Sequence, residues 1–382
     1  MRRPDTRSKR LPYTVYVGSY QSRFAAGIHR LQFDAETVTF RYLQGLSGIE
    51  NPSFLAWDEW NHHLYAVQET IADPKVFHIA RSPEGRLQWR ASFGQPTSTG
   101  LPCALTVVAQ SEARWMLVAN YAGGTVDGFR LSATGITGPR HFTVQHHGHG
   151  AHPTRQREAH PHSVVVDPSG RFVAVCDLGM DAIVIYRLRE DRDSVLDRIG
   201  IVPCIAQSGP RWLAFHPSLP CWYVVNELNA TISVYAWEDN FQAVHCIQEI
   251  STLPVHYAGP NAPAHLVFRQ HRLYVSNRGH NSLAVFSVSQ DDGRLEAITV
   301  VPLQARIPRH FVMTDDHGWM LVTGQESNHI EALRVDEGGL PQTTGVRYSI
   351  HRPTCIVLRN RGKINCTSRN QGRPTGSNTS GM

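Results

Sequence analysis

The hydrophobic residues of the chain fall into short runs that are separated by polar, turn-forming residues. Between His160 and Leu188 the sequence reads HPHSVVVDPSGRFVAVCDLGMDAIVIYRL, with β-branched and aromatic residues gathered in three runs. The intervening DPSG and LGMD provide the Gly, Pro and Asp that tight turns need. This pattern predicts three short antiparallel strands.

The same pattern recurs along the chain, which indicates a repeat architecture. Related segments begin at Glu50, Leu101, Gly209, Ala262 and Ile307. The repeats can be counted from Pro52, Pro102, Pro161, Pro210, Pro263, Pro308 and Pro353. Their period is roughly 45 to 60 residues, the length of a propeller blade. The sequence therefore predicts an all-β fold, a seven-bladed β-propeller with four antiparallel strands per blade.

Three strand-like segments near the two ends of the chain lack partners within the repeats. They are Tyr13 to Tyr20, Ile28 to Phe33 and Thr354 to Leu358. Pairing of the N- and C-terminal strands would close the ring and leave no exposed edge. Residues 1–11 and 359–382 are polar and aperiodic, so we expect a disordered basic arm and a disordered basic tail there. The propeller should span residues 12–358.

The composition supports a folded body and argues against nucleic acid as a partner. Hydrophobic residues make up 41% of the 382 residues and aromatic residues 9%, enough for a buried core. The net charge is +5, but residues 1–10 contribute +4 and residues 359–382 contribute +5, which leaves −4 for the body. The basic ends are typical of solvated tails.

The cysteine usage and the start of the chain indicate a cytoplasmic protein. Seven cysteines are scattered singly, without a CxxC pair, as expected for free thiols in a reducing compartment. The first residues show no apolar signal segment, and no apolar run is long enough to span a membrane. The sequence gives no indication of the oligomeric state.

Ionisable residues concentrate at one edge of the predicted blades. Antiparallel neighbours place the start of each first strand beside the end of each second strand, so His160 and His162 should lie beside Asp177. First strands contribute His160, His162, Arg211, His265, Arg309 and His310, and second strands contribute Asn120, Asp177, Glu227, Arg278 and Gln325. All of them should face one end of the central channel.

This ring has the chemistry of an anion site with a general base. Arginine favours carboxylate and phosphate oxygens, and histidine and glutamate are the usual bases at neutral pH. Each residue also has a structural alternative. Asp177 precedes Leu-Gly and can bind backbone N–H groups of a turn, and Glu227 can neutralise Arg211 or Arg278.

Residues 146–162 form a long loop between the second and third blades, with histidines at 146, 147, 149, 152, 160 and 162. Long loops on rigid scaffolds are commonly functional. Clustered histidines can bind zinc, but neither an H-E-x-x-H motif nor a Cys/His pairing accompanies them. We predict no metal and no cofactor.

At these residues the sequence resembles the seven-bladed lactonase family, which includes the propeller-type 6-phosphogluconolactonases and the fungal 3-carboxy-cis,cis-muconate cycloisomerase. The resemblance spans about residues 13–358. It rests on GSY, NPSFLA, ANYAGG, HPHSVVVDPSGRFVAVCDLGMD, GPR with LAFHP and NEL, LYVSNRGHNS, PRHF and PTCI. The segment ETIADPKVFHIA and the step Asp127-Gly128, where an apolar strand would be expected, depart from the family pattern.

The resemblance implies which residues act and on what. It assigns catalytic roles to His162, Arg211, Glu227 and Arg278, and substrate binding to Arg155, Arg309 and His310. With His160 and Asp177 added from the edge argument, these are the predicted site residues. The implied reaction is hydrolysis of a sugar lactone, most closely 6-phosphogluconolactone.

In that reaction Glu227 or His162 activates a water, Arg211 or Arg278 stabilises the oxyanion, and Arg155 or Arg309 holds the phosphate. The sequence does not separate the two bases. Two alternatives stay open at this point. One is a muconate-type lactonizing cycloisomerase, and the other is a non-catalytic interaction propeller.

Overall fold

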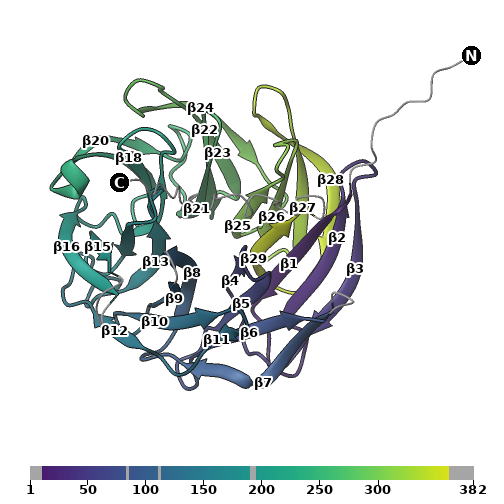
Figure 1. Cartoon of the computed structure of the whole chain (residues 1–382). Helices are drawn as coiled ribbons and strands as arrows, with labels where there is room; N and C mark the ends of the chain where they lie inside the picture. Colours follow the sequence, from purple (N-terminus) through teal and green to yellow (C-terminus); the bar gives the residue numbers. More distant parts are fainter. Residues whose placement is uncertain (1–10, 83–85, 111–112, 190–194, 361–382) are drawn as a thin grey trace, which may run out of the picture.

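The computed structural model describes residues 11–82, 86–110, 113–189 and 195–360. Nearly every regular element in these residues is a β-strand, and the strands form seven sheets around a central axis (Figure 1). Each sheet is an antiparallel blade whose first strand lies toward the axis. The predicted seven-bladed β-propeller with four antiparallel strands per blade is confirmed.

Six blades are made from consecutive strands. Blade 1 contains β4 (Leu55–Asp58), β5 (His63–Gln68), β6 (Lys75–Arg81) and β7 (Leu87–Pro96). Blade 2 contains β8 (Pro102–Gln110), β9 (Ala113–Asn120), β10 (Thr125–Ser132), β11 (Gly135–Ile136) and β12 (Phe142–Gln145). Blade 3 contains β13 (Pro161–Val166), β14 (Phe172–Asp177), β15 (Ala182–Leu188) and β16 (Leu196–Pro203).

The remaining consecutive blades follow the same order. Blade 4 contains β17 (Pro210–Phe215), β18 (Cys221–Asn226), β19 (Thr231–Glu238) and β20 (Ala243–Ser251), with a short 3₁₀ turn η1 (Asp239–Phe241). Blade 5 contains β21 (Ala262–Arg269), β22 (Arg272–Arg278), β23 (Ser282–Val288) and β24 (Leu295–Pro302). Blade 6 contains β25 (Pro308–Met313), β26 (Trp319–Gly324), β27 (His329–Val335) and β28 (Pro341–Ser349).

Blade 7 closes the ring with strands from both ends of the chain. Its order is β29 (Pro353–Arg359), β1 (Tyr13–Ser19), β2 (Ile28–Asp34) and β3 (Thr39–Leu46). The predicted tail was too long by one residue, because Arg359 pairs with Thr14 and forms an ion pair with Glu59. Leu11 and Asn360 are described and belong to no strand, and the remainder of the expected arm and tail, residues 1–10 and 361–382, lies outside the described residues.

Proline marks the start of the inner strand in five blades, namely β8, β13, β17, β25 and β29. Proline has no N–H to donate to the strand ladder, so the first position of a strand tolerates it. The predicted period was read from these prolines, and it therefore located the inner strands correctly.

The hydrophobic core lies between the blades. Middle strands such as β14 and β18 are buried on both faces. One core cluster joins blades 3 and 4, where Ile183 and Ile185 pack with Leu213 and Trp222. Burying a Val, Leu or Ile side chain contributes about 1.5–3 kcal/mol, so this repeated packing accounts for a rigid scaffold.

Blade 2 departs from the other blades in its outer strand. That strand is interrupted, and β11 and β12 both pair with β10. The step Asp127-Gly128, which departs from the family pattern, lies inside a strand, because β10 continues through both residues. The buried Asp127 carboxylate accepts hydrogen bonds from Ser98 N (2.7 Å), Asn120 Nδ2 (2.9 Å) and Thr143 Oγ1 (2.7 Å). Gly128 makes room for the Phe142 ring, which a Cβ would meet at 2.1 Å.

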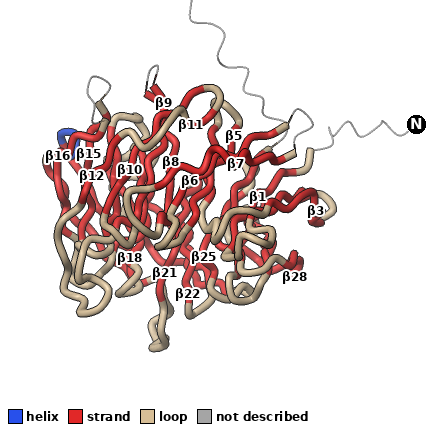
Figure 2. The backbone as a smooth tube through the Cα atoms, turned by 90° about the horizontal axis from the view of Figure 1, so that it is seen from below, coloured by secondary structure: helices blue, strands red, loops and turns tan. Residues whose placement is uncertain are grey.

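The two ends of the disc differ. Figure 2 shows the strands running between them, with the longer loops gathered along the lower edge. The inner strands begin, and the second strands end, at the same end of the central channel, which we call the channel mouth. Leu11 precedes β1 and Asn360 follows β29. Because Thr14 pairs with Arg359, both residues lie at the end of blade 7 that is opposite the mouth.

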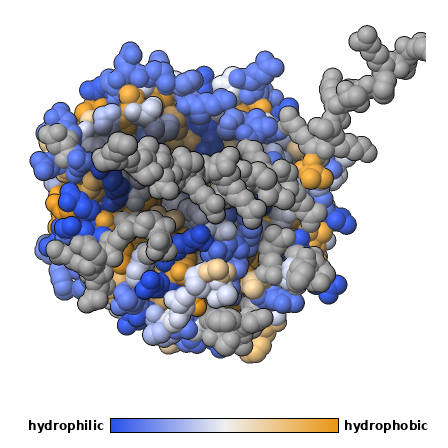
Figure 3. Space-filling model, viewed as in Figure 1, coloured by the Kyte–Doolittle hydropathy of each residue, from blue (hydrophilic) through white to orange (hydrophobic). Residues whose placement is uncertain are grey.

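The surface is mixed in character. On the face in Figure 3, hydrophilic residues cover much of the rim, with hydrophobic residues in scattered groups. In the part of the chain that the structure describes, no helix is long and apolar enough to cross a membrane.

Candidate active site at the channel mouth

A β-bulge near the start of the inner strand directs side chains into the channel. In blade 3, Pro161 pairs with Asp177 and Ser163 pairs with Cys176, so His162 is the extra residue. In blade 4, Arg211 is skipped in the same way between Pro210 and Trp212. Bulges re-aim side chains and are frequent beside active sites. This backbone irregularity explains why polar residues interrupt the apolar pattern at the same position of several blades.

The register shift recurs in blades 5 and 6. Ala264 and His265 lie in the bulge of β21, and Arg309 and His310 lie in the bulge of β25. We predicted His265, Arg309 and His310 at the mouth, and the strand register supports that placement.

Three arginines from different parts of the chain converge on Glu227, the residue that follows β18. Arg211 Nε and Arg278 Nη2 donate to Glu227 Oε2 at 2.8 and 2.7 Å, and Arg155 Nη2 donates to Oε1 at 2.7 Å. Arg155 also donates to Tyr121 Oη at 3.2 Å. We call these five residues the Glu227 cluster. Three guanidiniums and one carboxylate give it a net charge of +2.

Most of the Glu227 cluster is removed from water. Glu227 is 6% exposed and Arg211 is 4% exposed. Burial alone would raise the pKa of Glu227, but Arg278 and Arg211 outweigh it and hold the pKa well below its ordinary value. Burial and the nearby Arg278 lower the pKa of Arg211 to about 9, which still leaves it charged at neutral pH. The cluster is therefore a preformed, ionised unit.

Backbone carbonyls fix two of the arginines. Arg211 Nη1 donates to Ala264 O, and Arg278 Nε donates to Ala262 O at 2.9 Å. Both acceptors lie at the start of β21, so the inner strand of blade 5 holds guanidiniums from blades 4 and 5. Their remaining N–H groups are available to an oxyanion.

A small cavity at the axis adjoins the cluster and brings together three predicted site residues besides Arg211. It measures about 20 Å³, enough for one water molecule. Its lining includes His162, His265, Arg309 and His310.

The histidines at this cavity are neutral. Burial, together with Arg211, lowers the pKa of His162 well below its ordinary value, and burial lowers the pKa of His310 to about 3. Among the described residues, His162 Nδ1 has no hydrogen-bond partner. His265 and His310 stack at 3.9 Å between ring centres. His162 is thus a neutral imidazole with an unused nitrogen beside an ionised anion site.

The loop of residues 146–160 positions Arg155. Gln156 is buried, its Nε2 donates to Leu178 O at 2.9 Å, and its Oε1 accepts from His152 N at 2.8 Å. His160 stacks on the Tyr121 ring at 4.4 Å, which places Tyr121 where its hydroxyl meets Arg155. The predicted role of His160 in direct substrate binding stays a prediction.

The Asp177 carboxylate has partners within the protein on both of its oxygens. Its carboxylate is fully buried, and Oδ1 accepts hydrogen bonds from His160 N (2.7 Å) and Met180 N (3.0 Å). Oδ2 meets His146 Nδ1 at 2.7 Å, and His146 Nε2 meets Tyr186 Oη at 2.7 Å. Both oxygens are engaged in holding the turn and the histidine loop, which supports the structural alternative for Asp177, and its role in substrate binding stays a prediction.

One further residue of the predicted ring is also explained by local structure. Asn120 is fully buried and donates to Thr125 Oγ1 and Asp127 Oδ2 within blade 2. Gln325 follows β26 and is buried, and its backbone N–H donates to Ile307 O, but its side-chain Oε1 has no hydrogen-bond partner among the described residues.

A second group of charged residues, which was not predicted from the sequence, lies at the mouth. Tyr20 follows β1, Glu69 follows β5, and Arg352 precedes β29. Tyr20 Oη donates to Glu69 Oε1 and Oε2 at 3.1 and 3.0 Å, and the guanidiniums of Arg309 and Arg352 each lie 5.4 Å from the Tyr20 ring centre. We call these four residues the Tyr20 cluster. Applied to blades 7 and 1, the edge argument would have named its three new members.

The histidine loop does not form a metal site within the described residues. No group of three or more His, Cys, Asp or Glu side chains there is arranged to hold a metal ion. His146 is engaged by Asp177 and Tyr186, and His160 by Tyr121.

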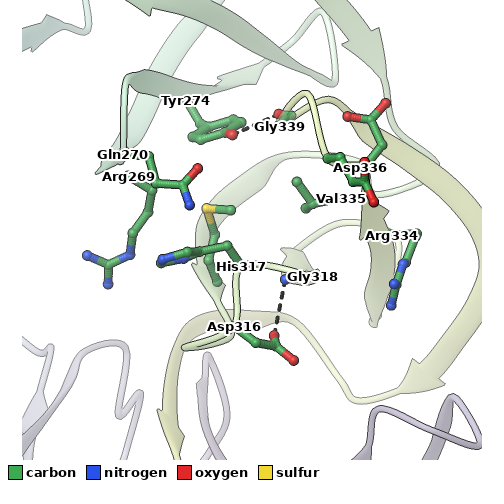
Figure 4. Close-up of a pocket in the computed structure, with 12 residues that line it drawn as sticks. Arg269, Gln270, Tyr274, Asp316, His317, Gly318, Arg334, Val335, Asp336 and Gly339 are labelled. Carbon is green, nitrogen blue, oxygen red and sulfur yellow. Dashed lines mark hydrogen bonds between the residues drawn. The ribbon is translucent and has the colours of Figure 1, made fainter.

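A larger cavity of about 210 Å³ lies between blades 5 and 6, away from the mouth (Figure 4). It is lined by turns that follow β21, β25 and β27, including Gln270, His317 and Asp336. Two of its acidic side chains serve their own turns, since Asp316 accepts from Gly318 N at 3.1 Å and Asp336 accepts from Leu340 N at 2.8 Å. No predicted site residue lines this cavity.

Comparison with known proteins agrees with this architecture. Residues 14–358 match the family model described as lactonase, 7-bladed beta-propeller. The chain is 28% identical over 353 residues to the 6-phosphogluconolactonase of Bacillus subtilis, covering 90% of this chain and 97% of that protein. It is 32% identical over 327 residues to an uncharacterized protein of Lactococcus lactis, covering 85% and 92% of the two chains.

Solved structures give the same result. The periplasmic gluconolactonase of Pseudomonas aeruginosa superimposes with a TM-score of 0.84 at 25% identity, over 91% of this chain and 99% of that one. The family resemblance found in the sequence is confirmed. The chain belongs to the seven-bladed β-propeller lactonase family and is a lactone-hydrolysing enzyme.

Proposed function

We propose that the enzyme hydrolyses 6-phospho-D-glucono-1,5-lactone to 6-phosphogluconate, a step of the pentose phosphate pathway. The observation that supports this most is that Arg211, a member of the ionised Glu227 cluster, and the neutral His162 line one small cavity. A net positive site suits a phosphorylated substrate and the negative charge that develops on a lactone carbonyl. The name of the Bacillus subtilis relative points to the same substrate.

We assign the role of general base to His162. Its imidazole is neutral, its Nδ1 is unpartnered among the described residues, and it lines a cavity of the size of a water molecule. Glu227 is a weaker base because three guanidiniums stabilise its charged form. In this assignment Glu227 keeps the arginines in place.

The reaction then proceeds as an acyl transfer to water. His162 takes a proton from the water as its oxygen bonds to the lactone carbonyl carbon, and Arg211 and Arg278 bind the oxyanion. One donor of this kind contributes about 3 kcal/mol to transition-state stabilisation. The ring C–O bond breaks as the protonated His162 returns the proton to the leaving alkoxide, which yields the open-chain carboxylic acid. This acid then loses its proton to solvent and becomes the carboxylate.

Two substitutions test these roles. His162→Asn should lower kcat/KM for the phosphorylated lactone about a hundredfold or more, because proton transfer to a positioned base is lost. Glu227→Gln should also slow hydrolysis, through misplaced arginines. If neither substitution reduces the rate more than about tenfold, the assignment is wrong, and turnover of a carboxymuconate without lactone hydrolysis would identify the cycloisomerase instead.

We further propose that the reaction takes place in the cytoplasm. The described cysteines are all free, including the buried Cys103, Cys176, Cys221 and Cys355. Free thiols are typical of reducing compartments.

A further inference from the structure

The Tyr20 cluster differs from the Glu227 cluster in how its arginines are satisfied. Arg309 is partly buried at the axial cavity, and Arg352 is exposed at the mouth. Within the described residues neither guanidinium forms an ion pair, and neither donates a hydrogen bond. Both contact the Tyr20 ring, and the carboxylates of Glu69 and Glu227 attract Arg309 without forming an ion pair with it. A partly desolvated guanidinium without an acceptor is costly, so a ligand anion would stabilise this arrangement.

The backbone holds Arg352 in an uncommon conformation beside Tyr20. Its φ of 40° lies in the left-handed region, which few residues other than glycine adopt. Asn328 Oδ1 accepts the Arg352 N–H at 2.9 Å, and Arg352 O accepts the Tyr20 N–H at 3.0 Å. The residues directly before Pro52, Pro102, Pro210 and Pro308 also have a positive φ, so this conformation belongs to the repeated start of the inner strand, and in blade 7 it fixes the backbone of Arg352 beside Tyr20.

Glu69 keeps the Tyr20 ring in place. Tyr20 Oη donates to both of its carboxylate oxygens, so this acidic group is occupied by a neutral partner. Burial raises the pKa of Tyr20 to about 12, and the ring therefore carries no charge at neutral pH. With two guanidiniums and one carboxylate, the cluster has a net charge of +1 before a ligand binds.

We propose that Arg309 and Arg352, arranged around Tyr20, form a separate subsite for the phosphate group of the substrate. This inference rests on the proposed function and assigns the phosphate to blades 6 and 7, whereas the lactone carbonyl binds at blades 3 to 5. Arg309 lines the same cavity as Arg211 and His162, so the phosphate subsite begins beside the reacting atoms. Arg155, which is bound to Glu227, then belongs to the reaction centre.

The test is a specificity ratio, the kcat/KM for 6-phosphogluconolactone divided by that for unphosphorylated gluconolactone. Arg352→Gln should lower this ratio about tenfold and Arg309→Gln at least as much, because each removes a charge-assisted hydrogen bond to phosphate. The matched control is Arg306→Gln, an exposed arginine in the loop before β25 that does not contact Tyr20 within the described structure. The ratio in this control should change less than twofold.

A second measurement separates this inference from the proposed function. The affinities for 6-phosphogluconate and for gluconate can be measured by calorimetry without turnover. Arg352→Gln should lower only the affinity for the phosphorylated ligand, again about tenfold. An unmodified protein that hydrolyses neither lactone would overturn the proposed function while these titrations still test the subsite. The subsite would be overturned if Arg352→Gln weakened the binding of 6-phosphogluconate and of gluconate equally. It would also be overturned if the kcat/KM ratio were unchanged in both Arg309→Gln and Arg352→Gln.

Discussion

Two groups of arginines meet at the channel mouth, and they differ in what neutralises them. In the Glu227 cluster the protein provides the counter-charge, since three guanidiniums share one buried carboxylate. In the Tyr20 cluster the only carboxylate, Glu69, is bound by a tyrosine hydroxyl, and the guanidiniums contact an aromatic ring. The first arrangement is preorganised for chemistry, and the second is open to an anion from solution.

The difference in burial has an energetic consequence. Removal of one partner of a buried ion pair leaves uncompensated charge, which costs far more than the loss of an exposed pair. The Glu227 cluster should therefore be important to stability as well as activity. The Tyr20 cluster should affect mainly which substrate binds.

The largest effect should come from Glu227→Gln, which leaves Arg211 and Arg278 buried without their carboxylate. We expect a loss of about 3–5 kcal/mol in the free energy of unfolding at pH 7, measured by denaturant titration. The matched variant Glu69→Gln, at a partly exposed carboxylate, should lose about 1 kcal/mol or less. Equal losses in the two variants would show that the clusters do not differ in the way described.

The stability of the Glu227 cluster should also depend on pH. Because the folded-state pKa of Glu227 is held below its ordinary value, its contribution is present at neutral pH and is lost as the pH falls through that folded-state pKa. The stability difference between the unmodified protein and Glu227→Gln should therefore shrink on acidification.

Much of this arrangement could be predicted from the sequence because propeller geometry is regular. The proline period located the inner strands, and the antiparallel pairing placed His162, Arg211, Glu227 and Arg278 at one end of the channel. What the sequence could not provide was the partner of each side chain. Asp177 occurs at the same edge as Glu227, yet it binds backbone N–H groups and His146 rather than arginines.

The missed residues have a physical explanation of the same kind. Tyr20 and Arg352 come from blade 7, whose two inner strands lie at opposite ends of the chain, so the edge argument reaches them only when it is extended across the predicted ring closure. Their pairing depends on ring closure, which brings positions more than 300 residues apart into contact. The bulges that direct the side chains into the channel could not be predicted either, because the apolar pattern of the strands continues on both sides of them.

An intermediate effect should appear in the pH dependence of kcat/KM. Burial and Arg211 lower the pKa of His162 well below its ordinary value, so the base stays neutral and active as the pH falls from 8 to 6.5. Below the folded-state pKa the rate should fall about tenfold per pH unit, as the imidazole becomes protonated. A rate profile with its acid limb centred at pH 7 or above would exclude His162, in this environment, as the base.

The smallest effect should come from Tyr20→Phe, because this change removes the hydrogen bond to Glu69 and keeps the ring that the two arginines contact. We expect a loss of about 1 kcal/mol in unfolding free energy and a change of about twofold in the substrate ratio defined above. Tyr20→Leu removes the ring as well, and it should lower that ratio further, since cation–π contacts contribute about 0.5–2 kcal/mol. If Tyr20→Phe changed the ratio as strongly as Arg352→Gln, the released Glu69 carboxylate, rather than the guanidiniums, would control access of the phosphate.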